Sequence, residues 1–434
     1  MHDTIYALSS GALPAGIAVV RISGPAAETI LTHLAGRTPT PSSAKLSQLR
    51  DGAGQILDHA LAIFFPEGRS FTGEPVAELH LHGGRAVLRS VFNAIAAFPN
   101  TRPAEPGEFT RRAFVNGRMD LTAAEGVADI IAAETEAQRR LAVGNSAGKQ
   151  RTLYQSWRER LIEARALIEA DLDFSDEGDV PGSVVDTVLE QVHQLRAAIE
   201  HHLGQFHRAE ILRDGFRVVI LGEPNVGKSS LLNALAQRDV AIVSDEAGTT
   251  RDLIEVALDL DGYKVVFTDT AGLRETENEV EKIGIERAQA AAEQADLVLH
   301  LYVNGQPQPS QKAGLHDIRY VSTKIDLIHE ASQSADFAVS THTGDGIAEL
   351  LSSIAALAQE AAGSTSLVLP TQERHVRLLQ RTVEALRKAE GLSLPLELRA
   401  EELRQAADHL GRITGMIGVE DLLDVVFSRF CIGK

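Results

Sequence analysis

Apolar and polar positions follow two different patterns along the chain. In the first part, short apolar runs typical of strands alternate with stretches of helical spacing. The strand signals are Ile17 to Ile22, Leu57 to Phe65 and Val76 to His82, and the helical signals are Ala26 to Leu34, Ala86 to Phe98 and Glu108 to Phe114. We therefore expect a small α/β domain over residues 1–117.

The pattern then becomes helical, reverts to alternation and becomes helical again. Apolar residues recur at helical spacing from Leu121 to about His207, with a loop at Asp171 to Ser183, and again over residues 370–434. Because the ends of a domain usually lie close together, an inserted α/β domain lets both flanking segments form one helical domain. We place the helical segments at residues 118–212 and 363–434 and the inserted domain at residues 213–362.

Composition describes a soluble, multidomain chain. The 434 residues, 44% of them apolar, predict about two to four domains. No apolar run reaches the length of a membrane span, and the first residues lack the features of a secretion signal. The single cysteine, Cys431, excludes a disulfide framework and a cysteine-based zinc site, which fits the cytoplasm. A net charge of −18 argues against nucleic-acid binding over a broad surface, although it permits a local basic patch.

One stretch has a specific chemistry. Gly222-Glu223-Pro224-Asn225-Val226-Gly227-Lys228-Ser229-Ser230 follows a strand signal at Phe216 to Leu221 and precedes a helical signal at Leu231 to Ala236. Glycines let such a loop fold around a polyphosphate, with Lys228 at the outer phosphates and Ser229 on Mg²⁺. A glycine-rich surface turn with a stray lysine is the alternative, and it does not account for the motifs that follow.

Further motifs follow in the order of a GTP site. Asp269-Thr270-Ala271-Gly272 ends a strand signal, where a γ-phosphate and Mg²⁺ would lie, and Gly248-Thr249-Thr250 offers Thr250 as the second Mg²⁺ ligand. Asp326, in Thr323-Lys324-Ile325-Asp326, can accept hydrogen bonds from N1 and the exocyclic amine of guanine. Ser340-Thr341-His342 would supply the last base-binding loop.

These motifs resemble the translation-factor-like GTPases over about 150 residues of the chain. Two positions depart from that pattern, which usually has Asn where this chain has Thr323 and Ala where it has Thr341. Asp326 keeps the main contact that discriminates guanine. We therefore expect guanine specificity with altered affinity.

The motifs do not by themselves identify the group that orients the attacking water in GTP hydrolysis. Leu273 stands where Ras-like proteins have a water-orienting glutamine, and leucine cannot bond water. Glu281 is a candidate to replace it, although an acidic run is more often a solvated helix start. Asn225 could hold a monovalent cation beside the phosphates, or it could serve turn geometry alone; the sequence favours neither.

With the carboxyl end included, nearly the whole chain resembles the MnmE (TrmE) family of tRNA modification GTPases. The matching stretches are Gly16 to Gly24, Pro106 to Thr110, Asn116 to Arg118, the GTPase motifs, Ile413 to Gly415, Glu420 to Leu423 and the terminus Phe427-Ser428-Arg429-Phe430-Cys431-Ile432-Gly433-Lys434. The implied fold is an N-terminal α/β folate-binding-like and dimerisation domain, a helical domain built from two segments and an inserted Ras-like P-loop GTPase domain.

The resemblance implies a GTP-hydrolysing enzyme that acts with the FAD-dependent partner MnmG in a heterotetramer or larger complex. The product would be tRNA with an aminomethyl or carboxymethylaminomethyl group on C5 of the wobble uridine U34. The carbon would come from 5-formyl-tetrahydrofolate or a related folate, held by Arg21, Glu78, Arg118 and Lys434. The family commonly has lysine where this chain has Arg118. A homodimer, and closure and opening of the GTPase domains on GTP binding, are implied as well.

By the same resemblance, K⁺ replaces an arginine finger, Glu281 orients water, and Cys431 takes part in the reaction. The implied K⁺ ligands are Asn225, Ser244, Glu246 and Thr249. The complete set for GTP is Asn225, Val226, Gly227, Lys228, Ser229, Ser230, Ser244, Asp245, Glu246, Ala247, Gly248, Thr249, Thr250, Asp269, Thr270, Ala271, Gly272, Thr323, Lys324, Asp326, Ser340, Thr341 and His342.

Two other groups of residues have mainly structural interpretations. His80 and His82 face the same side of a strand and form at most half a metal site, so we expect a structural role. Arg139, Arg140, Arg151 and Arg158 to Arg165 make the helical segment locally basic; the default is pairing with Glu159, Glu163 and Glu169, and tRNA contact is the less favoured interpretation.

Two other classes of protein share the nucleotide motifs. A ribosome-assembly or regulatory GTPase would normally carry an RNA-binding module and would not need a folate-type domain or a terminal cysteine. A scaffold whose GTPase only controls docking would fit Leu273, whereas Glu281 and Asn225 favour turnover.

Overall fold

The computed structural model describes residues 3–173, 184–238, 240–242, 254–269, 290–303, 317–327, 335–391, 394–418, 420–428, 430 and 432–433. The chain divides into two compact units. The first comprises Met1–Ala128, Tyr154–Arg160 and Ala407–Lys434, and the second comprises Asp129–Leu153 and Leu161–Ala406. In the part of the chain that the structure describes, no helix combines the length and apolar character that a membrane crossing requires.

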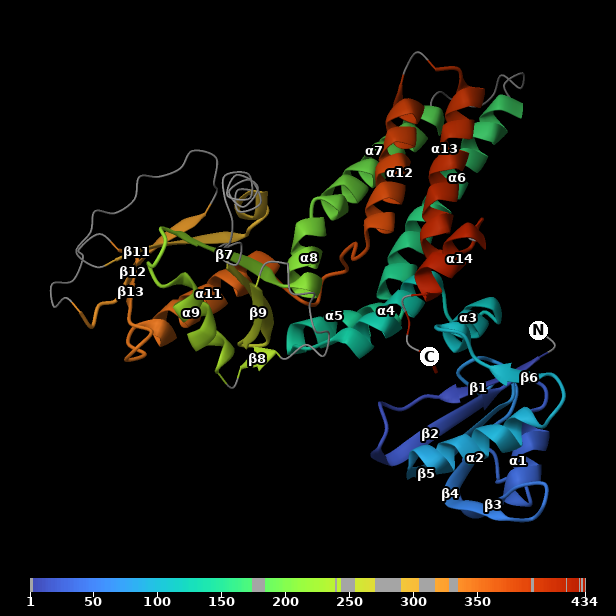
Figure 1. Cartoon of the computed structure of the whole chain (residues 1–434). Helices are drawn as coiled ribbons and strands as arrows, with labels where there is room; N and C mark the ends of the chain where they lie inside the picture. The colour runs from blue at the N-terminus through green and yellow to red at the C-terminus, as the bar shows by residue number, and fades with distance from the viewer. Residues whose placement is uncertain are drawn as a thin grey trace, which may run out of the picture. The chain divides into compact units, whose positions relative to one another are not determined.

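A six-stranded sheet is the framework of the first unit (Figure 1). Its strand order is β3-β4-β5-β2-β1-β6, and neighbouring strands are antiparallel except β1 and β6. The strands are β1 (Thr4–Leu8), β2 (Ala15–Ser23), β3 (Lys45–Arg50), β4 (Ile56–Phe65), β5 (Val76–Gly83) and β6 (Thr101–Pro103). The α/β class expected for this part of the chain is confirmed.

The expected strands are found as β2, β4 and β5, and the expected helices as α1 (Ala27–Ala35), α2 (Arg85–Ala96) and α3 (Glu108–Val115). Strands β1, β3 and β6 are additional. Strand β6 is very short, and β3 lies at the sheet edge with a sequence rich in polar residues. Such strands give little apolar signal, because they bury little surface.

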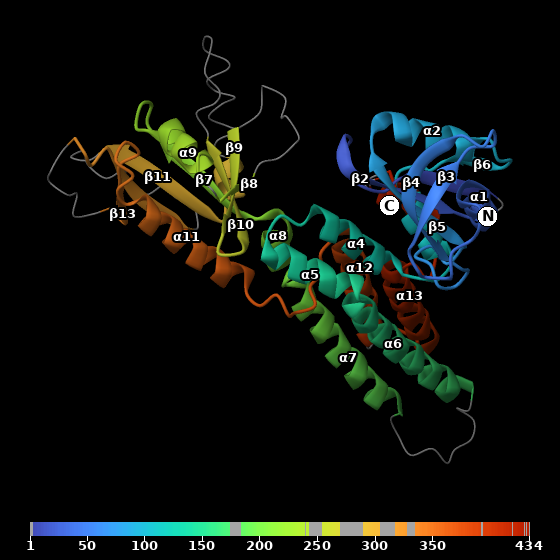
Figure 2. The same cartoon turned by 90° about the horizontal axis from the view of Figure 1, so that it is seen from below.

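Buried and less buried side chains alternate along β2 and β5, so the two faces of the sheet differ. Val20 of β2 and Leu79 of β5 are fully buried in a core that includes residues of helices α1 and α2. Figure 2 shows these two helices beside the strands of the sheet. Successive side chains of a strand point to opposite faces. The opposite face therefore carries Arg21, Glu78 and His80.

Helix α3 contacts the C-terminal helix α14 (Glu420–Phe427). Gly107, just before α3, has φ +69°, and a Cβ there would lie 2.3 Å from the carbonyl oxygen of Phe427. Only glycine fits this approach. Phe114 and Phe427 also pack together, with ring centroids 6.4 Å apart.

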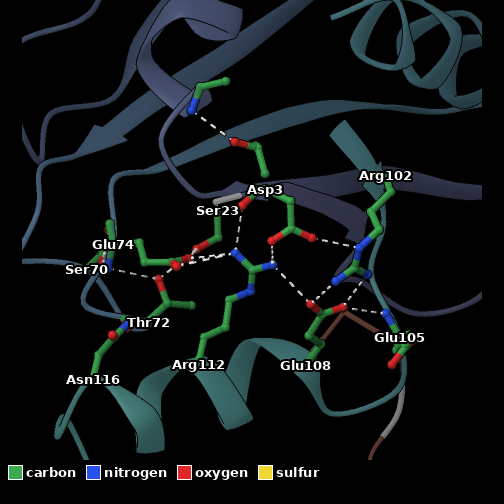
Figure 3. A network of polar contacts seen from close by, with 12 residues as sticks. Asp3, Ser23, Ser70, Thr72, Glu74, Arg102, Glu105, Glu108, Arg112 and Asn116 are labelled. Carbon is green, nitrogen blue, oxygen red and sulfur yellow. Dashed lines mark hydrogen bonds and ion pairs between the residues drawn. The ribbon is translucent and has the colours of Figure 1, made fainter. Parts of the chain in front are cut away.

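A buried arginine ties α3 to the sheet (Figure 3). The side chain of Arg112 has no exposed surface and donates to Asp3 Oδ1 at 2.9 Å, Glu108 Oε1 at 3.0 Å and Glu74 Oε2 at 3.1 Å. Arg102 joins Asp3 and Glu108 from the other side, at 2.8 and 2.6 Å. Burial raises the pKa of Glu108, but bonds and charges from both arginines outweigh burial and hold that pKa below its usual range. The ionised state of Glu108 thus depends on two arginines, the buried Arg112 and the partly exposed Arg102.

The second unit is built on a seven-stranded sheet, in the order β13-β12-β11-β7-β10-β9-β8. Strands β10, β7, β11, β12 and β13 are parallel, and β9 and β8 continue the sheet antiparallel. The strands are β7 (Phe216–Gly222), β8 (Ala241–Ile242), β9 (Ile254–Leu260), β10 (Tyr263–Asp269), β11 (Leu297–Val303), β12 (Ile318–Thr323) and β13 (Phe337–Val339). This mostly parallel sheet is the expected P-loop type of fold.

Two helices that lie mainly outside the predicted insert contribute residues to the hydrophobic core of the seven-stranded sheet. Ala137 and Leu141 of α5 (Glu136–Ser146) and Leu212 of α8 (Phe206–Asp214) belong to one buried cluster with the sheet residues. The turn between β9 and β10 is also joined to α5: the amide of Ala137 donates to Gly262 O at 2.9 Å. Nearby, Lys264 is paired with Glu134 at 2.6 Å.

Helices from before and after the insert lie side by side in the second unit. Arg196 of α7 (Val184–Leu203) contacts Glu390 of α12 (Glu373–Glu390) at 2.8 Å, and Arg387 contacts Glu200 at 2.9 Å. The other long elements are α4 (Leu121–Ala132), α6 (Lys149–Asp173), α11 (Ile347–Ala362) and α13 (Leu396–Thr414). The domain limits at residues 117, 212 and 362 stay predictions.

Replacing Arg112 by methionine is expected to lower the free energy of unfolding by about 3–5 kcal/mol at neutral pH, because it removes the counter-charge of buried carboxylates. Urea denaturation of the full chain measures the loss. Arg111→Met is the matched control, since Arg111 makes a surface pair with Asp424 worth at most about 1 kcal/mol.

The effect of Arg112→Met should also depend on pH. The lowered pKa of Glu108 means that the network stabilises the fold above the usual carboxylate range and loses this contribution as pH falls through the folded-state pKa. The difference between wild type and variant should therefore shrink in acid. An equal difference at about pH 7 and about pH 3 would contradict an ionised network.

Candidate functional site

The glycine-rich loop connects β7 to helix α9 (Lys228–Ala236), as the sequence predicts. Gly222 has φ +149°, and a Cβ there would lie 2.6 Å from Leu301 O, so glycine is required by close approach of strand β11. Asn225 and Gly227 also have positive φ, of 65° and 109°. These conformations curl the loop over the N-terminus of α9, where backbone N–H groups favour anions.

Lys228 and Ser229 already have partners at this loop. Lys228 is 8% exposed, and its ammonium donates to Gly222 O at 2.8 Å and Glu223 O at 3.0 Å. Ser229 Oγ donates to Asp269 Oδ2 at 2.8 Å, and Asp269 is fully buried at the end of β10. The structure thus brings Lys228, Ser229 and Asp269 together, whereas the second predicted Mg²⁺ ligand, Thr250, lies outside the described residues. Hydroxyl and carboxylate oxygens are a donor set that suits Mg²⁺.

Thr323 and Lys324 hold the phosphate loop from strand β12. Thr323 is 3% exposed, and its hydroxyl lies 2.7 Å from Val226 O and 3.2 Å from Tyr302 O. Lys324 has φ +58°, and its ammonium donates to Asn225 O at 2.8 Å. Thr323, which stands where the usual pattern has Asn, therefore links the base-reading motif to the phosphate loop.

Asp326 is held by the last base-binding loop. Ser340 Oγ donates to Asp326 Oδ1 at 2.6 Å, and this bond is the main reason why the pKa of Asp326 lies below its usual value. Ser340 Oγ in turn accepts the His342 amide at 3.2 Å. Thr341 is half-buried between them. Asp326 is thus ionised and can accept hydrogen bonds from a guanine.

Several predicted residues lie outside the described residues. They are Ser244, Asp245, Glu246, Ala247, Gly248, Thr249, Thr250, Thr270, Ala271, Gly272, Glu281, Cys431 and Lys434. Their roles stay predictions.

Two of the residues predicted for folate meet on the face of the first sheet that lies opposite α1 and α2. We call it the open face, although Phe109 of α3 is buried against part of it. Arg21 and Glu78 are cross-strand partners, and Arg21 Nε donates to Glu78 Oε1 at 3.0 Å. The Arg21 guanidinium also lies 5.6 Å from the ring centroid of Phe71 and 5.7 Å from that of Phe109. These cation–π contacts fix the arginine in place. Neither ring could be assigned to this site from the sequence, because their proximity to Arg21 depends on the fold.

Arg118 and the chain end lie close to other parts of the same unit. Arg118 is exposed, and its Cγ is 3.2 Å from where a Cβ of Gly73 would be. Ser9 Oγ donates to Gly433 O at 3.0 Å. Gly433 has φ +99°, and a Cβ there would lie 2.3 Å from Leu8 O. The described chain end is therefore fastened to the end of strand β1.

The two histidines of β5 differ in their surroundings. His82 is 73% exposed, and its ring is 2.7 Å from Asp58. His80 Nε2 is buried without a hydrogen-bond partner among the described residues, and lies 3.7 Å from Glu78 Oε2. Across the described ranges, no three His, Cys, Asp or Glu side chains are placed to hold a metal ion.

The basic residues of the helical segment are paired in part as expected. Arg165 pairs with Glu169 at 2.7 Å, which confirms the intrahelical alternative at that position. Arg139 and Arg140 both pair with Glu136, at 2.7 Å each.

The chain matches known families over nearly its whole length. A family model described as the MnmE helical domain matches residues 121–431, and one described as the GTP-binding protein TrmE N-terminus matches residues 4–118. The chain is 54% identical over 435 residues to the tRNA modification GTPase MnmE of Brucella melitensis biotype 1, covering 100% of this chain and 98% of that protein. It is 53% identical to the Brucella anthropi protein of the same name over 436 residues, covering 100% of this chain and 99% of that protein.

Among solved structures, Era of Aquifex aeolicus is 24% identical to this chain. The match covers 39% of this chain and 66% of that chain, with a TM-score of 0.27.

Replacing Thr323 by valine is expected to weaken guanine-nucleotide binding about fivefold to thirtyfold, because it removes the buried hydroxyl that holds Val226 O. Titration with a fluorescent GDP analogue measures this change. Thr323→Ser keeps the hydroxyl and should bind nearly as wild type. Equal losses in both variants would show that the hydroxyl is not the cause.

Proposed function

The chain belongs to the MnmE family, and from this premise we propose that it is a GTPase that acts in tRNA modification. The observation that carries the proposal is the joined nucleotide site: Lys228 in the phosphate loop, Asp326 held by Ser340, and Thr323 between them. One end of this site suits phosphates and the other suits guanine.

Nucleotide binding would exchange the present partners of the loop. Lys228 leaves Gly222 O and Glu223 O for the outer phosphates, which are stronger acceptors because they are charged. Ser229, which now donates to Asp269, and Thr250 would hold Mg²⁺, and the ion would offset the negative charge of the phosphates. Asp326 accepts N–H groups of guanine, which selects GTP over ATP.

Hydrolysis needs a water-orienting group and compensation of the charge that develops on the phosphates. We assign the first role to Glu281. For the second, Asn225, Ser244, Glu246 and Thr249 would hold K⁺, which supplies positive charge where other GTPases use arginine. Lys324 fixes the backbone of Asn225, and the Asn225 side chain is exposed beside the phosphate loop, so this ligand fits the role.

The open face of the first sheet would hold the folate. Glu78 accepts N–H groups of the pterin edge, and Arg21, Arg118 and Lys434 pair with polar ring atoms or the glutamate tail. The main support for folate at this face is Arg21, whose guanidinium is held in place by the rings of Phe71 and Phe109 and by Glu78. A bound 5-formyl-tetrahydrofolate or related folate supplies the one-carbon unit.

The complete reaction requires further partners. We propose that a homodimer works with FAD-dependent MnmG, as a heterotetramer or larger complex in the cytoplasm. Together they add an aminomethyl or carboxymethylaminomethyl group to C5 of U34 in certain tRNAs. Cys431 takes part, and Ser9 keeps the end of the chain at the sheet through Gly433.

Mass spectrometry of nucleosides from bulk tRNA, with and without the gene, tests this function. Loss of C5-aminomethyl-type uridines, restored by the intact chain but not by Cys431→Ser, is the expected result. An unchanged profile with abnormal ribosomal subunits would favour an assembly GTPase instead.

GTP hydrolysis is expected to be about 100-fold faster in K⁺ than in Na⁺ at equal ionic strength, because only K⁺ fits the proposed ligands. Asn225→Ala should abolish the difference, and Asn233→Ala, an exposed asparagine of α9, should keep it. Steady-state phosphate release measures both. Equal wild-type rates in the two salts would refute the cation role.

A further inference from the structure

His80 has an unusual position on the open face of the first sheet. Its Nε2 atom is buried, and among the described residues nothing accepts a hydrogen bond from it or donates one to it. The nearest charged oxygen, Glu78 Oε2, is 3.7 Å away, which is too long for a hydrogen bond. A buried polar atom without a partner costs free energy, so each such atom calls for an explanation.

The surroundings of His80 are polar at one end and apolar at the other. Its cross-strand neighbours are Val19 on β2 and Leu61 on β4, and Leu61 is 42% exposed. The polar neighbours of His80 are Glu78, on the same strand, and Arg21, which is bonded to Glu78. A flat ligand with a polar edge could therefore lie on the apolar side chains with its edge towards Glu78.

The two carboxylate oxygens of Glu78 have different neighbours. Arg21 binds Oε1 at 3.0 Å, which leaves Oε2 on the side of His80. A 2-amino-4-oxopyrimidine edge, as in a pterin, presents N–H donors beside a carbonyl acceptor. Glu78 can only accept when ionised, so it matches the donors and leaves the carbonyl without a partner. Neutral imidazole with its proton on Nε2 supplies the missing donor.

We propose that His80 is a specificity-determining residue, which donates from Nε2 to the 4-oxo group of a pterin whose N–H groups bind Glu78. This inference rests on the proposed use of a folate at the Arg21 and Glu78 face. It assigns a ligand contact to a residue for which the sequence predicts only a structural role.

The test compares the binding of 5-formyl-tetrahydrofolate with that of its 4-amino counterpart, 5-formyl-tetrahydroaminopterin, by calorimetry on the full chain. Wild type should prefer the 4-oxo ligand, because His80 donates to oxygen and cannot donate to an amino group. His80→Leu should bind the 4-oxo ligand about tenfold more weakly, the effect of one hydrogen bond, and should narrow the preference; the part that remains comes from the N3–H that only the 4-oxo ligand offers to Glu78. His80→Gln, whose amide can donate, should recover part of both.

His82→Gln is the matched control, because His82 lies on the same face of β5 but is exposed and bonded to Asp58. It should leave affinity and preference unchanged. GTP hydrolysis should be the same in all variants, which verifies that the second unit is folded, and urea denaturation of each variant verifies the fold of the first unit. If His80→Leu does not fold, imidazole ¹³C NMR of wild type replaces it: adding the 4-oxo ligand should shift the His80 signal and not that of His82.

The outcomes separate the two proposals. A wild-type chain that binds neither ligand would overturn the folate part of the proposed function. A His80→Leu variant that binds 5-formyl-tetrahydrofolate as tightly as wild type, or a wild-type His80 signal that does not move on adding this ligand, would overturn the role of His80 alone.

Discussion

The packing of helices α5 and α8 into the core of the nucleotide-binding sheet is the constraint on which the second unit depends. Leu141 and Leu212 come from helices outside the predicted insert, yet they are buried with the residues of β7 and β10. Leu369, which follows the insert, belongs to the same cluster. The GTP-binding segment is thus not a freely hinged module. A shift of its strands must either move these helices or open a cavity, which is costly in a packed core.

Polar contacts also join the nucleotide-binding sheet to helix α5. The turn between β9 and β10 is bound to α5 through Gly262 O and through Lys264 with Glu134. The other ends of these two strands are next in the chain to residues 243–253 and 270–289, which include Thr250 and Thr270 and lie outside the described residues. On the other side, Gln150 donates to Leu369 O at 2.6 Å and fixes the segment that leaves the sheet. A continuous set of contacts thus joins strands β9 and β10 to helix α5 and to the segment around Leu369.

The sequence predicted what depends on local pattern. The phosphate loop, its strand and its helix follow from glycine spacing and periodicity. Family resemblance singled out Arg21 and Glu78 as separate folate contacts, and their mutual hydrogen bond was not predicted. Contacts set by strand register could not be predicted. The bond from Thr323 to Val226, the rings around Arg21 and the isolated Nε2 of His80 depend on residues far apart in the chain. The extension of the GTPase core into α5 was missed for the same reason, because a helical pattern shows which face is buried but not against what.

Hydrogen exchange of the full chain, compared between GDP and a non-hydrolysable GTP analogue, tests most directly whether nucleotide state reaches the helices. The account predicts slower exchange with the analogue in α5, Glu136–Ser146, and around Leu369 as well as in the phosphate loop. Protection that changes only in the loops around the nucleotide, with α5 and the Leu369 segment unaffected, would contradict it.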